Sequence, residues 1–154
     1  MALPLRLQAL LDRCAPGLPL WDLCCDHGLL GLAALASGKF PEVIFNDSVP
    51  HVLTDLEPRL ADFANARRVL SLAEDIGESL TGNLVLAGIG GEKIFNILKS
   101  HNSHGRLNAH RLIACPEKRA EWLAAQNIAG YRLAESLTIP HNRGSRKILV
   151  FEIQ

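Results

Sequence analysis

Residues 23–30, with the sequence LCCDHGLL, place reactive side chains between two apolar segments. Two cysteines, an aspartate and a histidine in succession could hold a metal ion, form a redox pair, supply a nucleophile or cradle a ligand. The chain has four cysteines, but no C-x-x-C spacing and no second pair that would complete a zinc site. We therefore expect no metal and no disulfide framework. An alternative interpretation of Cys24 and Cys25 is that both are small buried residues.

The segments around this loop alternate between strand and helix patterns. Apolar runs predict strands over 18–23, 42–46, 67–72, 83–88, 110–115, 131–139 and 147–153. Helical spacing predicts helices before Pro16 and over 28–38, 53–63, 92–100 and 117–127, with Pro58 in the first turn of a restarted helix. Residues 140–146 are a polar loop between the last two strands. This order predicts one α/β domain over 1–154, whose seven-stranded, mostly parallel sheet ends in an antiparallel hairpin.

Acids and glycines stand where several of these strands end. Ligands of such sheets bind beyond the carboxyl ends of the strands. Asp47, after the second strand, is placed to hold a ribose diol. Glu74 and Asp75, after the third, could accept a hydrogen bond from the exocyclic amine of adenine, and glycines after the first and fourth strands let the backbone approach a ligand. The pattern predicts a site for an adenosine-containing ligand.

Two absent motifs narrow the choice of ligand. The chain has no G-x-x-x-x-G-K-[ST] loop for a triphosphate, and no G-x-G-x-x-G, because Lys93 stands where the third glycine would be. Asp26 would repel a pyrophosphate at the start of the following helix. An adenosine ligand with a positive sulfonium in place of phosphate fits better, and this predicts S-adenosylmethionine.

Three segments resemble the bacterial tRNA adenine-N1 methyltransferases that modify the D-arm region. They are DLCCDHGLL (22–30), ND (46–47) and LAGIGGEKIFNIL (86–98), and the likeness continues through 120–137. The family has a D-x-G-x-D-H-[GA]-Y-L-P loop after its first strand and an A-G-M-G-G turn after its fourth. The resemblance implies a Rossmann-like class I methyltransferase fold, S-adenosylmethionine as cofactor and tRNA as partner. It also implies a cofactor and reaction site lined by Asp22, Asp26, His27, Asp47, Asp75 and Gly88.

Together, the strand ends and the resemblance give a set of predicted site residues. The predicted cofactor-binding residues are Asp22, Cys24, Asp26, Gly28, Asp47, Ser48, Glu74, Asp75, Ala87, Gly88 and Gly90. Methylation of adenine N1 leaves a cationic product, and an acid close by would stabilise that charge. We predict Asp26 in this catalytic role, with His27 orienting it or accepting a proton. An alternative is that Asp26 only caps the following helix.

The first loop departs from the family pattern at three positions. Cys24 replaces a glycine, Leu29 an aromatic residue and Gly31 a proline. The likeness also ends before the family's helical C-terminal extension, so we expect a short form without it. Alternative functions are a methyltransferase of another RNA or a small molecule, and a non-catalytic nucleotide or RNA binder. A nicotinamide oxidoreductase is disfavoured by the missing glycine fingerprint.

Charge is unevenly spread, although the net charge is zero. Residues 1–77 hold 10 acidic and 6 basic residues, and residues 78–154 hold 6 acidic and 10 basic residues. The basic half could meet an anionic partner. We nevertheless expect Arg143, Arg146 and Lys147 at a solvated hairpin tip, and the H-x-x-H pair His101 and His104 in a polar loop.

The N-terminal segment and the longest apolar run bear on the location of the protein. Arg6 and Arg13 interrupt the N-terminal apolar residues, which disfavours a secretory signal. The apolar run at 28–36 is too short to span a bilayer. We expect a cytoplasmic protein without membrane contact, and the sequence sets no oligomeric state.

Overall fold

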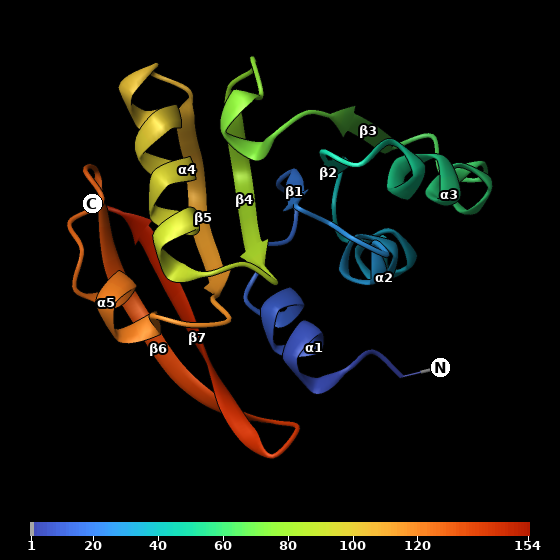
Figure 1. Cartoon of the computed structure of the whole chain (residues 1–154). Coiled ribbons are helices and arrows are strands. Elements are labelled where there is room, and N and C mark those ends of the chain that lie inside the picture. Colours follow the sequence, from blue (N-terminus) through green and yellow to red (C-terminus); the bar gives the residue numbers. More distant parts are fainter. Residues whose placement is uncertain (1) are drawn as a thin grey trace.

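Strands and helices alternate along most of the chain in the computed structural model, which describes residues 2–154 (Figure 1). The strands are β1 (Leu20–Leu23), β2 (Val43–Asp47), β3 (Ala66–Leu70), β4 (Leu80–Ala87), β5 (Leu107–Cys115), β6 (Tyr131–His141) and β7 (Gly144–Ile153). The helices are α1 (Leu5–Asp12), α2 (Leu29–Ser37), α3 (Pro50–Leu60), α4 (Gly91–Ser103) and α5 (Ala120–Ala124), with a 3-10 helix η1 (Ala73–Asp75).

All seven strands form one sheet in the order β3-β2-β1-β4-β5-β7-β6. Strands β1 to β5 are parallel to their neighbours, whereas β7 pairs antiparallel with both β5 and β6. The prediction of a mostly parallel α/β sheet with a C-terminal hairpin is confirmed. The strand order reverses between β1 and β4, and this switch point is where such sheets place their ligands.

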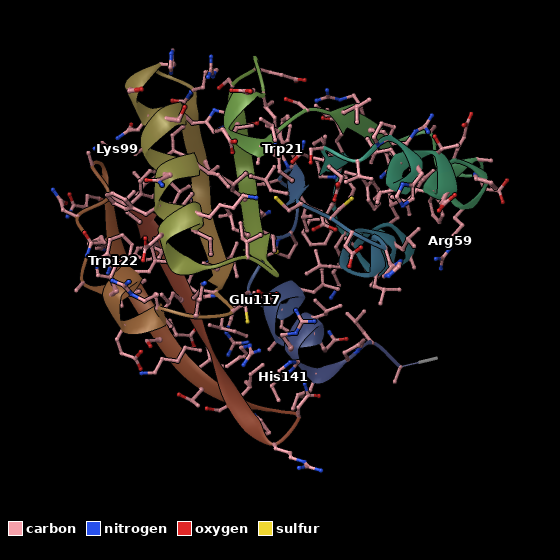
Figure 2. All side chains as sticks on the ribbon, viewed as in Figure 1. Trp21, Arg59, Lys99, Glu117, Trp122 and His141 are labelled. Carbon is pink, nitrogen blue, oxygen red and sulfur yellow. The ribbon has the colours of Figure 1, made fainter. Side chains whose placement is uncertain are left out.

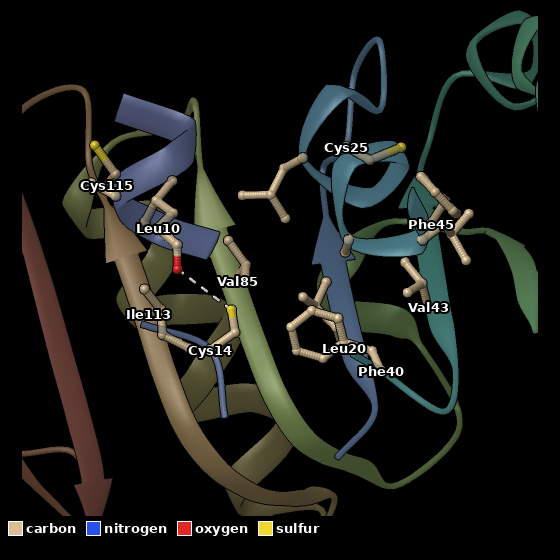
Figure 3. Packing of buried hydrophobic residues seen from close by; sticks show 14 of the residues in the cluster. Leu10, Cys14, Leu20, Cys25, Phe40, Val43, Phe45, Val85, Ile113 and Cys115 are labelled. Atoms are coloured by element: carbon tan, nitrogen blue, oxygen red, sulfur yellow. Dashed lines mark hydrogen bonds between the residues drawn. The ribbon is translucent and has the colours of Figure 1, made fainter. Parts of the chain in front are cut away.

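Helices cover both faces of the sheet, and each face has its own core. On one face, Leu10 of α1, Leu30 of α2 and Leu56 of α3 belong to the cluster that contains Phe45 and Val85 (Figure 3). On the other face, residues of α4 and α5 pack with Leu84 and Leu86. Burial of these apolar side chains on both faces is the main stabilising term of the fold.

Gly31 explains how closely α2 approaches β2. A Cβ atom at this position would stand 2.2 Å from Cε2 of Phe45, which is below any tolerable contact. The residue that differs from the family's proline is therefore required by packing in this chain. The missing side chain lets the first turn of α2 pack closely against Phe45 of β2.

Several element boundaries differ from those predicted. Helix α3 begins at Pro50, which sits in its first turn, and continues through Pro58 without a restart. Pro58 has no N–H to donate to the Thr54 carbonyl, so the helix continues past it without that hydrogen bond. Strand β4 begins at Leu80, and the helix expected over 117–127 shortens to five residues because Arg119 adopts a left-handed φ of 63° before it.

The C-terminal hairpin and the H-x-x-H pair also differ from prediction. The loop expected over 140–146 is only a two-residue turn, because β6 extends to His141 and β7 begins at Gly144. His101, expected in a loop, lies in α4 and is fully buried. Within residues 2–154, no helix is both long and apolar enough to cross a membrane.

Candidate functional site

A cavity of about 440 Å³ opens at the carboxyl ends of the central strands. It lies at the switch point of the sheet and has the size of a small-molecule site. Many of the predicted residues line it together: Asp22, Cys24, Asp26, His27, Gly28, Asp47, Ala87 and Gly88. The structure thus brings the loops after β1, β2 and β4 to one cavity.

The loop after β1 has an unusual backbone. Cys24, Asp26 and Gly28 have φ values of 53°, 50° and 72°, so alternate residues are left-handed. This conformation is ordinary for glycine and strained for other residues. Cys24 therefore keeps a glycine-like backbone at the position where the resembling family has glycine.

Hydrogen bonds from the end of β2 hold this loop in place. The backbone N–H of Asp26 donates to Oδ2 of Asp47 at 3.1 Å, and that of Cys25 donates to the carbonyl of Asn46 at 2.8 Å. Oδ1 of Asp47 accepts the N–H of Val49 at 3.0 Å. Asp47 therefore orders two loops and still has a free acceptor position on each carboxylate oxygen.

Asn46 has a structural role in the site. The sequence motif ND (46–47) contains this residue but does not indicate that role. Asn46 is fully buried. Its amide Nδ2 donates to the carbonyls of Val69 at 3.2 Å and Ser71 at 3.0 Å, and its Oδ1 accepts the Cys24 N–H at 3.4 Å. It ties together the carboxyl ends of β1, β2 and β3. The sequence feature that indicates this structural role is a side-chain amide at the end of an apolar strand.

Asp22 is a buried carboxyl group in the cavity wall. Burial raises its pKa from 3.8 to about 7, while the backbone N–H of Gly31 lowers it and the charge of Asp47 raises it. The Gly31 N–H donates to Oδ2 of Asp22 at 3.2 Å, which couples β1 to the first turn of α2. A cationic ligand in the cavity would offset the cost of the buried charge.

Asp26 and His27 lie at the open side of the cavity. Their side chains are 75% and 84% exposed, and Oδ1 of Asp26 lies 3.9 Å from Nε2 of His27. The N-cap residue of α2 is Gly28, with no side-chain cap, so the alternative in which Asp26 caps this helix is wrong. Both side chains are free to meet a ligand that enters from solvent.

Four predicted cofactor-binding residues do not line the cavity. Ser48 is exposed, and Glu74 and Asp75 lie in η1. Burial raises the pKa of the Cys24 thiol, and the charges of Asp47 and Glu74 add to that rise. The cofactor roles of these residues stay predictions.

The fourth, Gly90, has a packing role. A Cβ atom there would stand 3.2 Å from Cε of Lys118, and the next residue, Gly91, donates its N–H to the Lys118 carbonyl at 2.9 Å. The Glu117 N–H donates to the carbonyl of Ile89 at 2.9 Å. These contacts lock the loops after β4 and β5 together at the edge of the cavity.

Further lining residues come from α1, from the end of β5 and from the hairpin, and of these only the end of β5, with Glu117, is a strand end at which the sequence predicts ligand contacts. They are Arg6 and Leu7 from α1, Cys115 and Glu117 at the end of β5, and His141 and Arg146 from the hairpin. In Figure 2, Glu117 and His141 lie close to α1. Arg146 was expected at a solvated tip, and its place in the cavity wall corrects that expectation.

Strand register explains how the hairpin reaches the cavity. Ala114, next to the last residue of β5, pairs with Leu149 of β7. Residues 144–147 therefore extend past the carboxyl end of β5, and β6 follows them because Pro140 pairs with Ser145. Sequence periodicity predicts the hairpin but carries no information on this offset.

A second cavity of about 100 Å³ adjoins the first and shares Asp26 and His27 with it. Its other lining residues are Val52, Asp55, Leu56 and Arg59, all from α3. In the part of the chain that the structure describes, no three His, Cys, Asp or Glu side chains are grouped so that they could hold a metal ion.

Comparison with known proteins decides the family. A family model described as a methyltransferase domain matches residues 3–144. The chain belongs to the methyltransferase domain family. No curated protein matches its sequence.

Solved structures with the same fold are longer proteins of low sequence identity to this methyltransferase domain. A Streptococcus pneumoniae protein, assigned as a tRNA (m1A22) methyltransferase, has a TM-score of 0.86 at 22% identity, covering 99% of this chain and 71% of its own. The B. subtilis m1A22 tRNA methyltransferase TrmK has a TM-score of 0.84 at 20% identity, covering 99% and 67%. M. capricolum TrmK, solved with S-adenosylhomocysteine, has a TM-score of 0.81 at 16% identity, covering 100% and 70%. At these identities the likeness shows the fold.

Proposed function

We propose that this methyltransferase domain uses S-adenosylmethionine to methylate N1 of an adenine in tRNA. The observation that carries the proposal is the single cavity at the β1/β4 switch point, in which Asp22, Asp47 and the loop with Asp26 converge. The solved relatives add support, because the B. subtilis protein is an m1A22 tRNA methyltransferase and the M. capricolum protein holds the product of the cofactor.

The residues at the cavity fit the proposed cofactor. Gly88 has a φ of 75° and no atom within 4 Å of where its Cβ would be, so its backbone is open to a ligand. The free acceptor positions on Asp47 suit the two hydroxyls of a ribose. The carboxyl group of Asp22 suits a positively charged ligand, because such a ligand compensates its buried charge.

When bound, S-adenosylmethionine supplies an activated methyl group. The protein therefore has mainly to align the acceptor nitrogen with this methyl group and to exclude water. Asp26 and His27 lie where the cavity opens to solvent, which is where a nucleotide of a large RNA would enter. In this proposal the Asp26 carboxylate stabilises the positive charge that develops on the adenine ring, and His27 orients that carboxylate. The acceptor nitrogen needs no deprotonation, because adenine N1 carries a lone pair.

The test is transfer of a radiolabelled methyl group from S-adenosylmethionine to bulk tRNA, followed by nucleoside analysis. We expect 1-methyladenosine as the labelled product at low salt, with transfer declining as salt is raised because phosphate contacts weaken. Asp26→Asn should lower the rate by about ten- to a thousandfold, as loss of one electrostatic stabiliser does, and leave cofactor affinity within a few-fold.

Asp62→Asn serves as the control, because Asp62 is an exposed acid beyond the end of α3. It should behave as the unmodified chain does. Cofactor binding without label in any RNA would refute the tRNA substrate and favour a small-molecule acceptor. Label in a nucleoside other than 1-methyladenosine would refute the methylated atom.

A further inference from the structure

The cavity has two walls of opposite charge. The loops after β1 and β2 contribute Asp22, Asp26 and Asp47, whereas α1 and the hairpin contribute Arg6, His141 and Arg146. The acidic wall suits the ribose and the sulfonium of the proposed cofactor. The basic wall suits neither of these two groups.

Arg6 has an unsatisfied donor at this wall. Its Nε atom is buried and has no hydrogen-bond partner among the described residues 2–154. Six other arginines pair with glutamates, for example Arg13 with Glu135 at 3.0 Å, and these include Arg111, whose Nε is also buried and unsatisfied but lies 3.6 Å from Oε1 of Glu152. A buried guanidinium nitrogen without an acceptor is costly, which indicates that an acceptor arrives from outside the protein.

Arg146 and His141 bring further positive charge to the same place. In the part of the chain that the structure describes, the side chain of Arg146 has one hydrogen bond, from Nη1 to the carbonyl of its neighbour Ser145 at 3.3 Å. Desolvation lowers the pKa of His141, and the charges of Arg146 and Arg6 lower it further, so the three groups lie within electrostatic reach of one another. Glu117, the acid on this side of the cavity, forms no ion pair with either arginine within the described residues 2–154.

Both arginines converge on the end of β5. Burial raises the pKa of the Cys115 thiol, while Arg6 and Arg146 both lower it. The two residues are far apart in sequence, yet α1 contacts β5, β6 and β7, which places them on the same wall. Guanidinium groups that are not paired with a carboxylate are suited to an oxyanion, and their forked donors match phosphate in particular.

We propose that Arg6 and Arg146 bind the backbone phosphate of the RNA nucleotide whose base enters the cavity. The inference rests on the proposed function and adds the element that holds the substrate. A base that meets Asp26 at the open side would place its sugar and phosphate toward the opposite wall. The other oxyanion that could reach these arginines is the carboxylate of the cofactor itself.

The experiment measures two affinities in the full chain with Arg146→Gln, Arg6→Gln and the double variant. Fluorescence anisotropy with labelled tRNA at several salt concentrations gives the RNA affinity, and calorimetry gives the S-adenosylmethionine affinity. We expect each single variant to weaken tRNA binding several-fold. Each should also reduce the slope of log K against log salt by about 0.7–0.9, the value for one phosphate contact, while cofactor affinity stays within twofold.

Arg143→Gln is the matched control, because Arg143 lies in the hairpin turn and is exposed, but does not line the cavity. It should leave the slope and both affinities unchanged. If Arg6→Gln fails to fold, Arg146→Gln decides alone, since Arg146 lies on the partly exposed hairpin.

Three results would overturn the inference. An unchanged salt slope in the double variant would remove the phosphate contact, and an equal effect of Arg143→Gln would reduce it to general electrostatics. A loss of cofactor affinity with normal RNA binding would assign the arginines to the cofactor carboxylate. In each case methyl transfer to tRNA by the unmodified chain leaves the proposed function standing, whereas absence of tRNA binding by that chain overturns both.

Discussion

Asp22→Asn should stabilise the ligand-free protein, and more so as the pH rises. The folded state raises the pKa of Asp22 from 3.8 to about 7 because the carboxyl group is buried. Between these values the folded state holds a proton that the unfolded state has lost, so stability falls with rising pH across this window and the cost is complete above pH 7. Asparagine carries no charge and can still accept the Gly31 N–H.

The magnitude follows from the width of that window. Each unit of pKa difference corresponds to about 1.4 kcal/mol, so the raised pKa of Asp22 lowers the free energy of unfolding by about 4 kcal/mol above pH 7, where the buried group is ionised, and by about 1.5 kcal/mol at pH 5, where it is still protonated. The difference in free energy of unfolding between Asp22→Asn and the unmodified chain should therefore grow by about 2–3 kcal/mol in favour of the variant between pH 5 and pH 8.

Urea unfolding at both pH values, without ligand, measures this difference. Asp62→Asn is again the control and should change nothing, because Asp62 is exposed. An advantage of Asp22→Asn that is the same at pH 5 and pH 8 would refute the assignment of a buried, proton-binding carboxyl group at this position.

Three further variants test the surroundings of the cavity. Asp47→Ala should weaken S-adenosylmethionine binding by about 1.5–3 kcal/mol, as for a charged hydrogen bond; unchanged affinity by calorimetry in a folded variant would remove the ribose assignment. Cys24→Gly should keep or improve cofactor affinity and change the free energy of unfolding by no more than about 1 kcal/mol, because relief of the left-handed strain offsets the added flexibility; a clear loss of affinity would make Cys24 a ligand contact. His101→Ala should lower the free energy of unfolding by about 2–3 kcal/mol, because two buried groups would lose their hydrogen-bond partner. These groups are the Ala73 carbonyl, 2.7 Å from Nε2 of His101, and Nε of Arg106, 3.3 Å from Nδ1. Burial lowers the pKa of His101, so the unmodified chain should lose stability as the pH falls below 6.5, and an Ala variant that keeps this dependence would contradict the assignment.

Much of the fold could be predicted because local patterns agree with it. Apolar runs marked the strands, and the strand–helix alternation required a parallel sheet whose strand ends meet at one edge. This is why Asp22, Asp26 and Asp47 were placed together from sequence. Element ends were less predictable, since they depend on single backbone conformations such as that of Arg119.

The basic wall was not predictable, for a different physical reason. Arg6 and Arg146 meet only because α1 packs against the hairpin and because β7 extends past the end of β5. Neither the packing nor the register offset leaves a local pattern. Gly91 is a related case: a Cβ atom there would stand 2.6 Å from the carbonyl oxygen of Arg119, so packing against the loop after β5 requires glycine at a position that the sequence pattern assigned only to a strand-to-helix turn.

The central claim is that the cavity at the β1/β4 edge binds S-adenosylmethionine. Isothermal titration of the full chain with S-adenosylmethionine, S-adenosylhomocysteine and NAD tests it most directly. We predict saturable binding of the first two at one site per chain, with no binding of NAD, because Asp26 lies where a pyrophosphate would have to sit. Binding of NAD, or no binding of either adenosyl compound, would contradict the account.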